Sequence, residues 1–296
     1  MKISKVWALV CCLLVLIGCS DSEQISQETA RLTINLTDAP FPHDMIAEAN
    51  VTVFKIEARH VADDENDEMN EDNDEMDEES ETDYAVLMED EITVNLLDLT
   101  NGVTETLVDT EIPVGEYDLF RVYVKGVNVV LNDEDMTTYD LKVPSGEQSG
   151  IKIFVDPALV VAGGLSTDLL FDFDVYSSFV PRGNIKNLES FNGFNFKPVI
   201  KVSNLTTAGT FKGSVTTLVE AESVPLAGVQ ITVLQEGEIV TTSFTDETGG
   251  YMVLGLESGD YQLTADLEGY FAKSEEGVTV IPGNTTVVDF ELEPTE

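Results

Sequence analysis

Three aspartates at even spacing are the strongest candidates for chemistry in this chain: Asp168, Asp172 and Asp174. Side chains of a β-strand alternate between its two faces, so all three would lie on one face, opposite Phe171 and Phe173. Successive positions on that face are ~7 Å apart, and carboxylates at this spacing could share a hard cation such as Ca²⁺. Calcium is therefore the one candidate metal, and we expect no other cofactor. The alternative is the ordinary polar outer face of a half-buried strand.

The sequence offers no set of residues for catalysis. Its two histidines, His43 and His60, have no serine or cysteine partner at a recognisable spacing, and no Gly-x-Ser-x-Gly elbow is present. Acidic pairs are too abundant among 56 acidic residues to single out a general acid and base. We predict that the chain is not an enzyme. A hydrolase would need a deep pocket holding two carboxylates with raised pKa values.

The first eighteen residues read as a secretory leader. Lys2 and Lys5 precede an apolar run over 6–17, which is shorter than the ~20 residues needed to cross a bilayer. The run ends in Leu16-Ile17-Gly18-Cys19, which resembles the bacterial lipobox. That resemblance implies removal of residues 1–18 and lipidation of Cys19, which becomes the first residue of the mature chain.

The expected location follows from this lipid. Acyl chains on Cys19 would anchor the protein in the outer membrane of the cell envelope, since each buried CH₂ contributes ~0.8 kcal/mol. Residues 19–29 would form a polar tether. Its Ser20-Asp21-Ser22-Glu23 segment is similar to the acidic tethers that accompany export of lipoproteins to the cell surface, and a simple solvated linker is the alternative.

Composition narrows the partners. The chain has 15 basic residues against 56 acidic ones, a net charge of −41 at pH 7. Such a charge repels nucleic acid and anionic headgroups, so we expect no nucleic-acid partner and a membrane contact through lipid alone. Once Cys11 and Cys12 leave with the leader, a disulfide, a cysteine nucleophile and a cysteine metal site are all excluded.

The rest of the chain alternates with a period of two, which predicts an all-β protein with two antiparallel β-sandwich domains in tandem. The first would span residues 30–203, with Asp38-Ala39-Pro40 as one of its turns. Fourteen of the twenty-one residues from 63 to 83 are acidic, so we expect a disordered insertion there. A linker over 204–208 would lead to a second sandwich over 209–296.

The second unit resembles the carboxypeptidase regulatory-like domain, a transthyretin-like sandwich grouped with carbohydrate-binding-like folds. The motifs that carry the likeness are Pro225-Leu226-Ala227-Gly228-Val229, Thr245-Asp246-Glu247-Thr248-Gly249-Gly250-Tyr251 and Gly259-Asp260-Tyr261. Gly228 and the Asp246–Gly250 segment fit tight turns that need positive φ. The resemblance implies a module without catalytic residues, and carbohydrate binding by analogy of fold.

The first unit resembles an uncharacterised domain of bacterial lipoproteins, domain of unknown function 4382. The likeness rests on Leu36-Thr37-Asp38-Ala39-Pro40, Ile112-Pro113-Val114-Gly115-Glu116-Tyr117 and Leu170-Phe171-Asp172-Phe173-Asp174-Val175. It implies a fold and a location, and no activity.

These observations favour a non-catalytic, membrane-anchored lipoprotein that acts as a binding or adhesion module, with a glycan as one candidate ligand. A structural accessory that docks envelope proteins is the alternative, and a hydrolase is the third. Sugar rings stack on exposed aromatic residues, and the candidates here are Tyr123, Tyr139, Tyr176 and Tyr270. The mature chain would have no tryptophan for this purpose.

Overall fold

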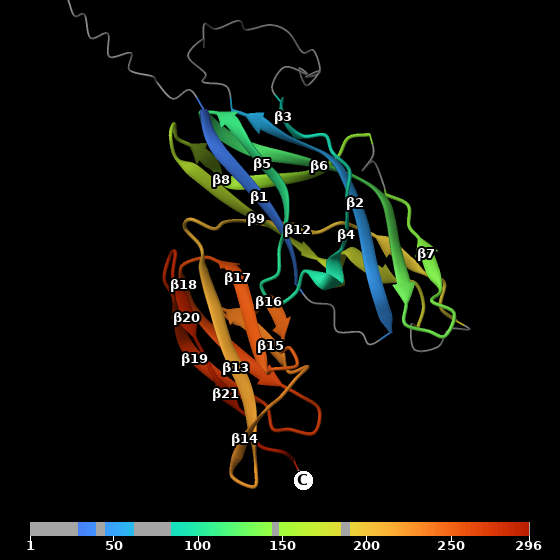
Figure 1. The fold of residues 1–296 in the computed structure, drawn as a ribbon, viewed down its shortest axis with the longest axis vertical. Helices are drawn as coiled ribbons and strands as arrows, with labels where there is room; N and C mark the ends of the chain where they lie inside the picture. The colour runs from blue at the N-terminus through green and yellow to red at the C-terminus, as the bar shows by residue number, and fades with distance from the viewer. Residues whose placement is uncertain (1–28, 40–44, 62–83, 144–147, 185–189, 296) are drawn as a thin grey trace, which may run out of the picture.

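The computed structural model describes residues 29–39, 45–61, 84–143, 148–184 and 190–295. It forms two β-sandwich domains stacked end to end along the long axis of the molecule (Figure 1). The predicted all-β fold with two sandwiches in tandem is thereby confirmed. The leader 1–18, Cys19, most of the tether and the acidic insertion 63–83 lie outside the described residues.

The first domain contains most of the strands in the chain. Its elements are β1 (Thr29–Ala39), β2 (Ile46–His60), β3 (Tyr84–Met88), β4 (Ile92–Asn95), the 3-10 turn η2 (Leu96–Asp98), β5 (Glu105–Pro113), β6 (Gly115–Leu131), β7 (Thr138–Asp140), β8 (Ile151–Val161), β9 (Ser166–Asp174), the helical turn α1 (Val175–Ser178), β10 (Phe179–Pro181), β11 (Phe194–Phe196) and β12 (Ile200–Asn204).

Two sheets of this domain face each other. One has the order β12-β9-β1-β5, and the other has the order β3-β2-β6-β7 with β4 on β2 and β8 on β6. The alternation seen in the sequence places one face of each strand in the core between the sheets. Phe120 of β6 and Phe171 of β9 meet across that core, with ring centroids 5.7 Å apart and the rings nearly perpendicular.

The second domain follows the same plan on a smaller scale. Its strands are β13 (Gly209–Val219), β14 (Glu222–Pro225), β15 (Gln230–Gln235), β16 (Glu238–Phe244), β17 (Gly250–Leu256), β18 (Gly259–Asp266), β19 (Lys273–Val280), β20 (Thr285–Val287) and β21 (Phe290–Glu291). β13 joins β14, β17, β20 and β21 in one sheet, and the other has the order β16-β15-β18-β19. Phe211 and Tyr261 pack edge to face between them.

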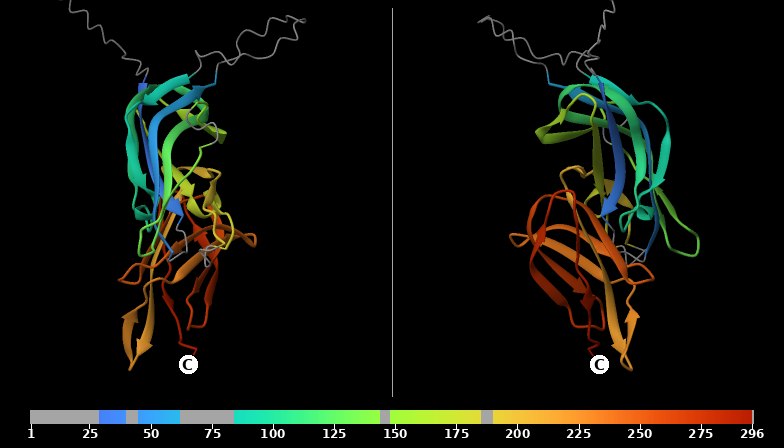
Figure 2. Two further views of the ribbon diagram at one scale, coloured as in Figure 1. Left: turned by 90° about the vertical axis from the view of Figure 1, so that its right-hand side faces the viewer. Right: turned by 60° about the vertical axis from the view of Figure 1, so that its left-hand side comes forward.

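Not every strand pair is antiparallel. β1 runs parallel to β9, and β13 runs parallel to β20 and to β21. In the β1–β9 pair Thr37 lies beside Asp172, so the C-terminal ends of the two strands lie side by side. These strand ends face the second domain (Figure 2). Asp38 and Ala39 belong to β1, which corrects the prediction of a turn at Asp38-Ala39-Pro40.

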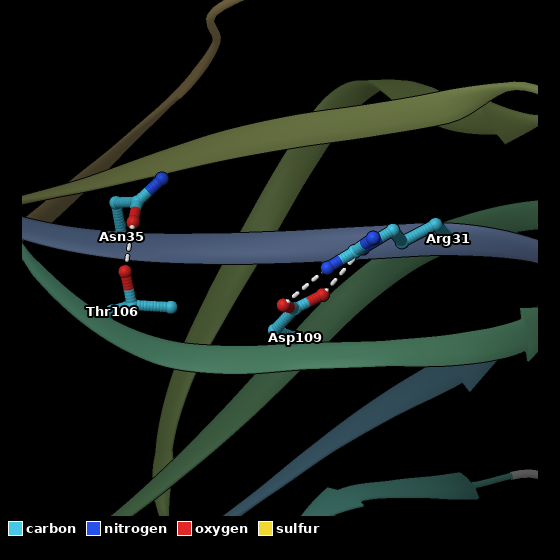
Figure 3. Close-up of polar contacts among 4 residues, drawn as sticks. All are labelled: Arg31, Asn35, Thr106 and Asp109. Atoms are coloured by element: carbon cyan, nitrogen blue, oxygen red, sulfur yellow. Dashed lines mark hydrogen bonds and ion pairs between the residues drawn. The ribbon is translucent and has the colours of Figure 1, made fainter.

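Toward the opposite end of β1, polar side chains of its outer face pair with β5. Arg31 donates two hydrogen bonds to the carboxylate of Asp109 on β5, at 2.6 and 2.5 Å, and Thr106 donates to Asn35 at 2.8 Å (Figure 3). The hydrogen bonds from Arg31 lower the pKa of Asp109. The outer face of β1 is thus open at Arg31, whereas Thr37 on the same face is buried. The second domain covers only the end of β1 that contains Thr37.

Both sandwiches use the same corner to start a long central strand. The Tyr117 hydroxyl donates to the carbonyl of Pro113 at 3.0 Å, and the Tyr261 hydroxyl donates to the carbonyl of Glu257 at 2.9 Å. Each tyrosine stands two residues after a glycine, in one of the motifs that carry the family resemblances. The hydrogen bond across four residues fixes where the turn ends and the strand begins.

Candidate functional site

The two domains are held together by polar contacts to backbone carbonyls. Lys201 Nζ donates to the carbonyl of Val240 at 2.6 Å, and Ser203 Oγ donates to that of Gly255 at 2.7 Å. From the loop after η2, Asn101 Nδ2 donates to the carbonyl of Gly250 at 3.2 Å. The junction therefore joins β12 and the loop after η2 to strands β16 and β17.

Close approach at this junction requires a small residue. Gly255 has φ +74°, and a Cβ there would stand 3.0 Å from both Leu170 Cδ2 and Ser203 Oγ of the first domain. A side chain at this position would strain the backbone and push the domains apart. The same constraint operates within the second domain at Gly249, whose φ of +76° confirms the predicted tight turn before β17.

A groove of about 610 Å³ opens beside these contacts. Its walls are strand β8, the end of β12 with the linker, and the β17–β18 turn of the second domain. The lining residues are Val155, Asp156, Pro157, Ala158, Leu159, Val160, Leu169, Val202, Ser203, Asn204, Thr207, Ala208, Gly255, Glu257, Ser258 and Pro282. The walls combine aliphatic side chains with hydrogen-bonding groups, and none of the lining residues is basic or aromatic.

A bulge in β8 shapes one wall. Tyr117 of β6 pairs with Leu159 and Leu119 pairs with Phe154, so four residues of β8 stand opposite one residue of β6. These four, 155–158, all line the groove. β8 pairs with β6 on one side only, so its other edge faces the groove. An edge strand with a bulge is a frequent device for shaping a site and for preventing further strand pairing.

The three aspartates predicted to bind calcium lie along β9, as the alternation indicated. Asp168 is level with Thr33 on β1, and Asp172 is level with Thr37. Asp174 caps α1, and its carboxylate accepts hydrogen bonds from Ser177 N at 2.8 Å and Ser177 Oγ at 2.9 Å. Within the described ranges no group of three or more His, Cys, Asp or Glu side chains is placed to hold a metal ion. Calcium binding by this set stays a prediction.

Sequence reasoning overlooked the most unusual carboxylate, Asp38. Its side chain is 5% exposed, and its Oδ1 accepts a hydrogen bond from Val175 N at 3.2 Å. Burial, followed by the charge of Asp172, raises the pKa of Asp38 well above its usual range. A signal was available, because the inward positions Leu32, Ile34 and Leu36 continue to Asp38 at the same period. The neighbouring proline directed the interpretation toward a turn instead.

Asp38 and Asp172 line a second, much smaller cavity of about 20 Å³ at the same junction. This meets one part of the requirement for a hydrolase, a pair of carboxylates of which one has a raised pKa. It does not meet the other part, because a volume of this size holds about one water molecule and admits no sugar or peptide.

Most of the other candidate residues that the structure describes pack within the domains. Tyr123 is buried and donates to Glu57 Oε2 at 2.7 Å, and Tyr139 packs on Phe191 and Phe194. Tyr270 is half-buried against the second core, and Tyr176 is exposed on α1. His60 packs edge to face on Tyr117. His43 lies outside the described residues. Among the residues that the structure describes, no helix is long and apolar enough to cross a membrane.

Two family models match the chain. The model described as "Domain of unknown function (DUF4382)" matches residues 29–198, and the model described as "Carboxypeptidase regulatory-like domain" matches residues 210–293. Both resemblances, and their order along the chain, are confirmed. No curated protein matches the chain.

Several solved structures share a distant likeness. The minor pilin of Streptococcus agalactiae is 13% identical, with 90% of this chain and 97% of the pilin covered, at a TM-score of 0.25. The shaft pilin SpaA of Lactobacillus rhamnosus GG is 8% identical, with 90% and 98% covered, at 0.25. The Bacillus anthracis TIE protein is 11% identical at 0.25, and 92% of this chain covers 42% of its length. Likeness at this level carries no argument about function.

Proposed function

For this chain, which belongs to the DUF4382 family over residues 29–198, we propose the function of a non-catalytic lipoprotein of the cell envelope that binds a ligand between its two domains. Cys19 would carry the lipid that anchors it in the outer membrane, and carbohydrate is the ligand class that we favour. The observation that carries this proposal is the groove of about 610 Å³ at the domain junction.

The size and place of the groove support ligand binding. Binding sites in proteins typically have volumes of ~300–1,000 Å³ and occur preferentially where two domains meet. Here the first domain provides β8 and β12, while the second provides the turn around Glu257. Because the walls come from both domains, the groove exists only in the assembled two-domain chain.

The chemistry of the walls supports a neutral, hydroxyl-rich ligand. Asp156 and Glu257 provide carboxylates, Asn204 an amide, and Ser203 and Ser258 hydroxyls. These groups accept and donate hydrogen bonds to sugar hydroxyls, while the intervening valine, leucine and proline side chains can pack on the apolar faces of a sugar ring. An anionic ligand would meet two carboxylates and no basic residue of the lining.

The experiment is retention of the protein on a panel of immobilised polysaccharides, with Glu257→Gln and Asn204→Ala as groove variants. We expect at least one polysaccharide to retain the full chain, and each substitution to weaken retention by about tenfold, since Asn204→Ala removes an amide and Glu257→Gln replaces a charged acceptor by a neutral amide. Glu275→Gln is the matched control, because it neutralises an exposed carboxylate on β19 outside the groove. Equal loss in the control and the groove variants would refute the assignment of the groove.

A second candidate function is docking of another envelope protein, and exposed apolar residues on β8 favour it. Phe154 is 68% exposed and Val160 is 64% exposed, both on the strand that forms the groove wall. Large apolar side chains in solvent are typical anchors of protein interfaces. If no polysaccharide retains the protein, co-purification from membranes with Phe154→Ala should lose a partner that Phe271→Ala, an equally exposed control in the second domain, retains.

A further inference from the structure

The small cavity at the domain junction has the dimensions of a single-ion site. Its volume is about 20 Å³, enough for one water molecule or one cation. It lies where β1 and β9 end against β16 and β17. The first domain lines it with Thr37, Asp38, Asn101, Gly102 and Asp172, and the second with Thr241, Thr242, Ser243, Met252, Val253 and Leu254.

Two buried oxygen atoms of these lining residues have no hydrogen-bond partner in the structure: Asp38 Oδ2 and Asn101 Oδ1. Buried polar atoms are nearly always paired, so each such atom requires an explanation, and an unpaired carboxylate oxygen is especially costly. The Asn101 amide is oriented by its Nδ2, which donates to the carbonyl of Gly250 in the second domain. That contact uses the amide nitrogen, so Oδ1 is left to bind a ligand of the cavity.

The cavity also concentrates negative charge. Asp38 and Asp172 both line it, and none of the eleven lining residues is basic. Lys201 is level with Asp172 on β12, and its Nζ donates to the carbonyl of Val240 across the junction. A water molecule could donate to the two unpaired oxygens. It would bring no positive charge to the buried carboxylate of Asp38.

We propose that this cavity binds one hard divalent cation, Ca²⁺ in preference to Mg²⁺, through Asp38, Asp172 and Asn101. Carboxylate and amide oxygens are the ligands that Ca²⁺ prefers, and it tolerates irregular sets of six to eight oxygens that include hydroxyls, carbonyls and water. Threonine and serine at 241–243 supply such oxygens from the second domain. The cation would therefore fasten the two domains together. This set shares only Asp172 with the three aspartates selected from the sequence.

The test is the melting temperature of the full chain in calcium and in a chelator. We expect saturating Ca²⁺ to raise the Tm of the wild-type chain by about 5 °C or more. Asp38→Asn should lose most of that shift and should melt higher than the wild type in the chelator, because it removes a buried charge. The acidic segment 63–83 will attract cations in both proteins, so only the difference between them reports on the cavity.

Three further variants define the ligand set. Asn101→Ala should also lose the calcium shift, and it replaces Asp38→Asn as the test if that variant does not fold. Asp168→Asn separates this site from the set along β9, and Asp140→Asn, which changes an exposed carboxylate of β7, controls for charge; both should keep the full shift. An equal shift in the wild type, Asp38→Asn and Asn101→Ala would overturn the proposal. The absence of any calcium shift in the wild type would also overturn it, and would assign the cavity to water.

Discussion

At the scale of single residues, Asp38 has the most distinctive environment in the described part of the chain. It continues the inward row of Leu32, Ile34 and Leu36 and is as buried as its apolar neighbours. A carboxylate at such a position is stabilised by a proton or by a cation. Asp172 strengthens this requirement, because a second negative charge lies on the adjacent strand.

The raised pKa of Asp38 predicts how the stability of the cation-free protein changes with pH. The folded chain holds the Asp38 proton more tightly than the unfolded chain, whose carboxyl has the ordinary pKa of 3.8. Between that pH and the raised value the folded state binds more protons, so its stability falls as the pH rises. This contribution is fully present below pH 3.8 and is lost as the pH passes through the raised pKa.

Urea denaturation of the wild type and Asp38→Asn in chelator, from about pH 5 to about pH 8, measures this contribution. We expect the free energy of unfolding of Asp38→Asn, relative to that of the wild type, to increase as the pH rises. Other acidic residues titrate in both proteins and cancel in the difference. A difference that is constant across this range would show that Asp38 has an ordinary pKa.

At the scale of elements, the tyrosine corners are the shared device of the two sandwiches. Tyr117 and Tyr261 each place an aromatic ring in the core and a hydroxyl on a carbonyl four residues earlier. The ring is a packing element, and the hydroxyl fixes the geometry of the turn. Removing the hydroxyl alone therefore separates the two contributions.

We predict that Tyr117→Phe and Tyr261→Phe each lower the free energy of unfolding by roughly 1–2 kcal/mol, because each leaves a carbonyl without its partner. Urea denaturation followed by circular dichroism measures the loss. Tyr176→Phe is the control, because its side chain is exposed on α1, and it should change stability by less than about 0.5 kcal/mol. Equal effects at all three positions would contradict this role of the corners.

The same elements explain how much of the fold the sequence could predict. Alternation identified strands such as β9 and β18 because one face of each is buried. Gly249 indicated a turn because glycine is favoured where φ is positive, as it is there. Alternation gives the face of a strand but not its neighbour, so the parallel pairing of β1 with β9 was not predictable. That pairing is decided by packing of residues that are far apart in the chain.

The candidate site was less predictable than the fold, for a related reason. Asp172 stood out as part of a patterned strand, but Asp38 and Asn101 stood next to turn signals and looked like ordinary loop residues. The cavity that they line is completed by residues 241–243 and 252–254 of the second domain, which no local pattern around Asp38 or Asn101 encodes. The groove depends likewise on Glu257 and Ser258 meeting β8, a contact that no local pattern encodes.

At the scale of the whole molecule, the position of β1 orients the protein. The strand begins at the end of the first domain that is far from the second domain (Figure 1). Asp38, near its other end, lines the cavity at the junction. An anchor at Cys19 would therefore hold the first domain near the membrane and the second domain farther out. The strand itself spans ~35 Å along this axis.

This arrangement makes Cys19 the only attachment that we expect between the chain and the membrane. The net charge of −41 opposes binding to anionic headgroups, so acyl chains must supply the affinity. We predict that Cys19→Ala moves the protein from the membrane to the soluble periplasmic fraction, as measured by cell fractionation and immunoblotting. Cys11→Ala and Cys12→Ala are matched controls within the predicted leader and should leave the protein in the membrane. Retention of Cys19→Ala in the membrane would mean that a protein partner holds the chain there, and would favour docking through β8 over a lipid anchor.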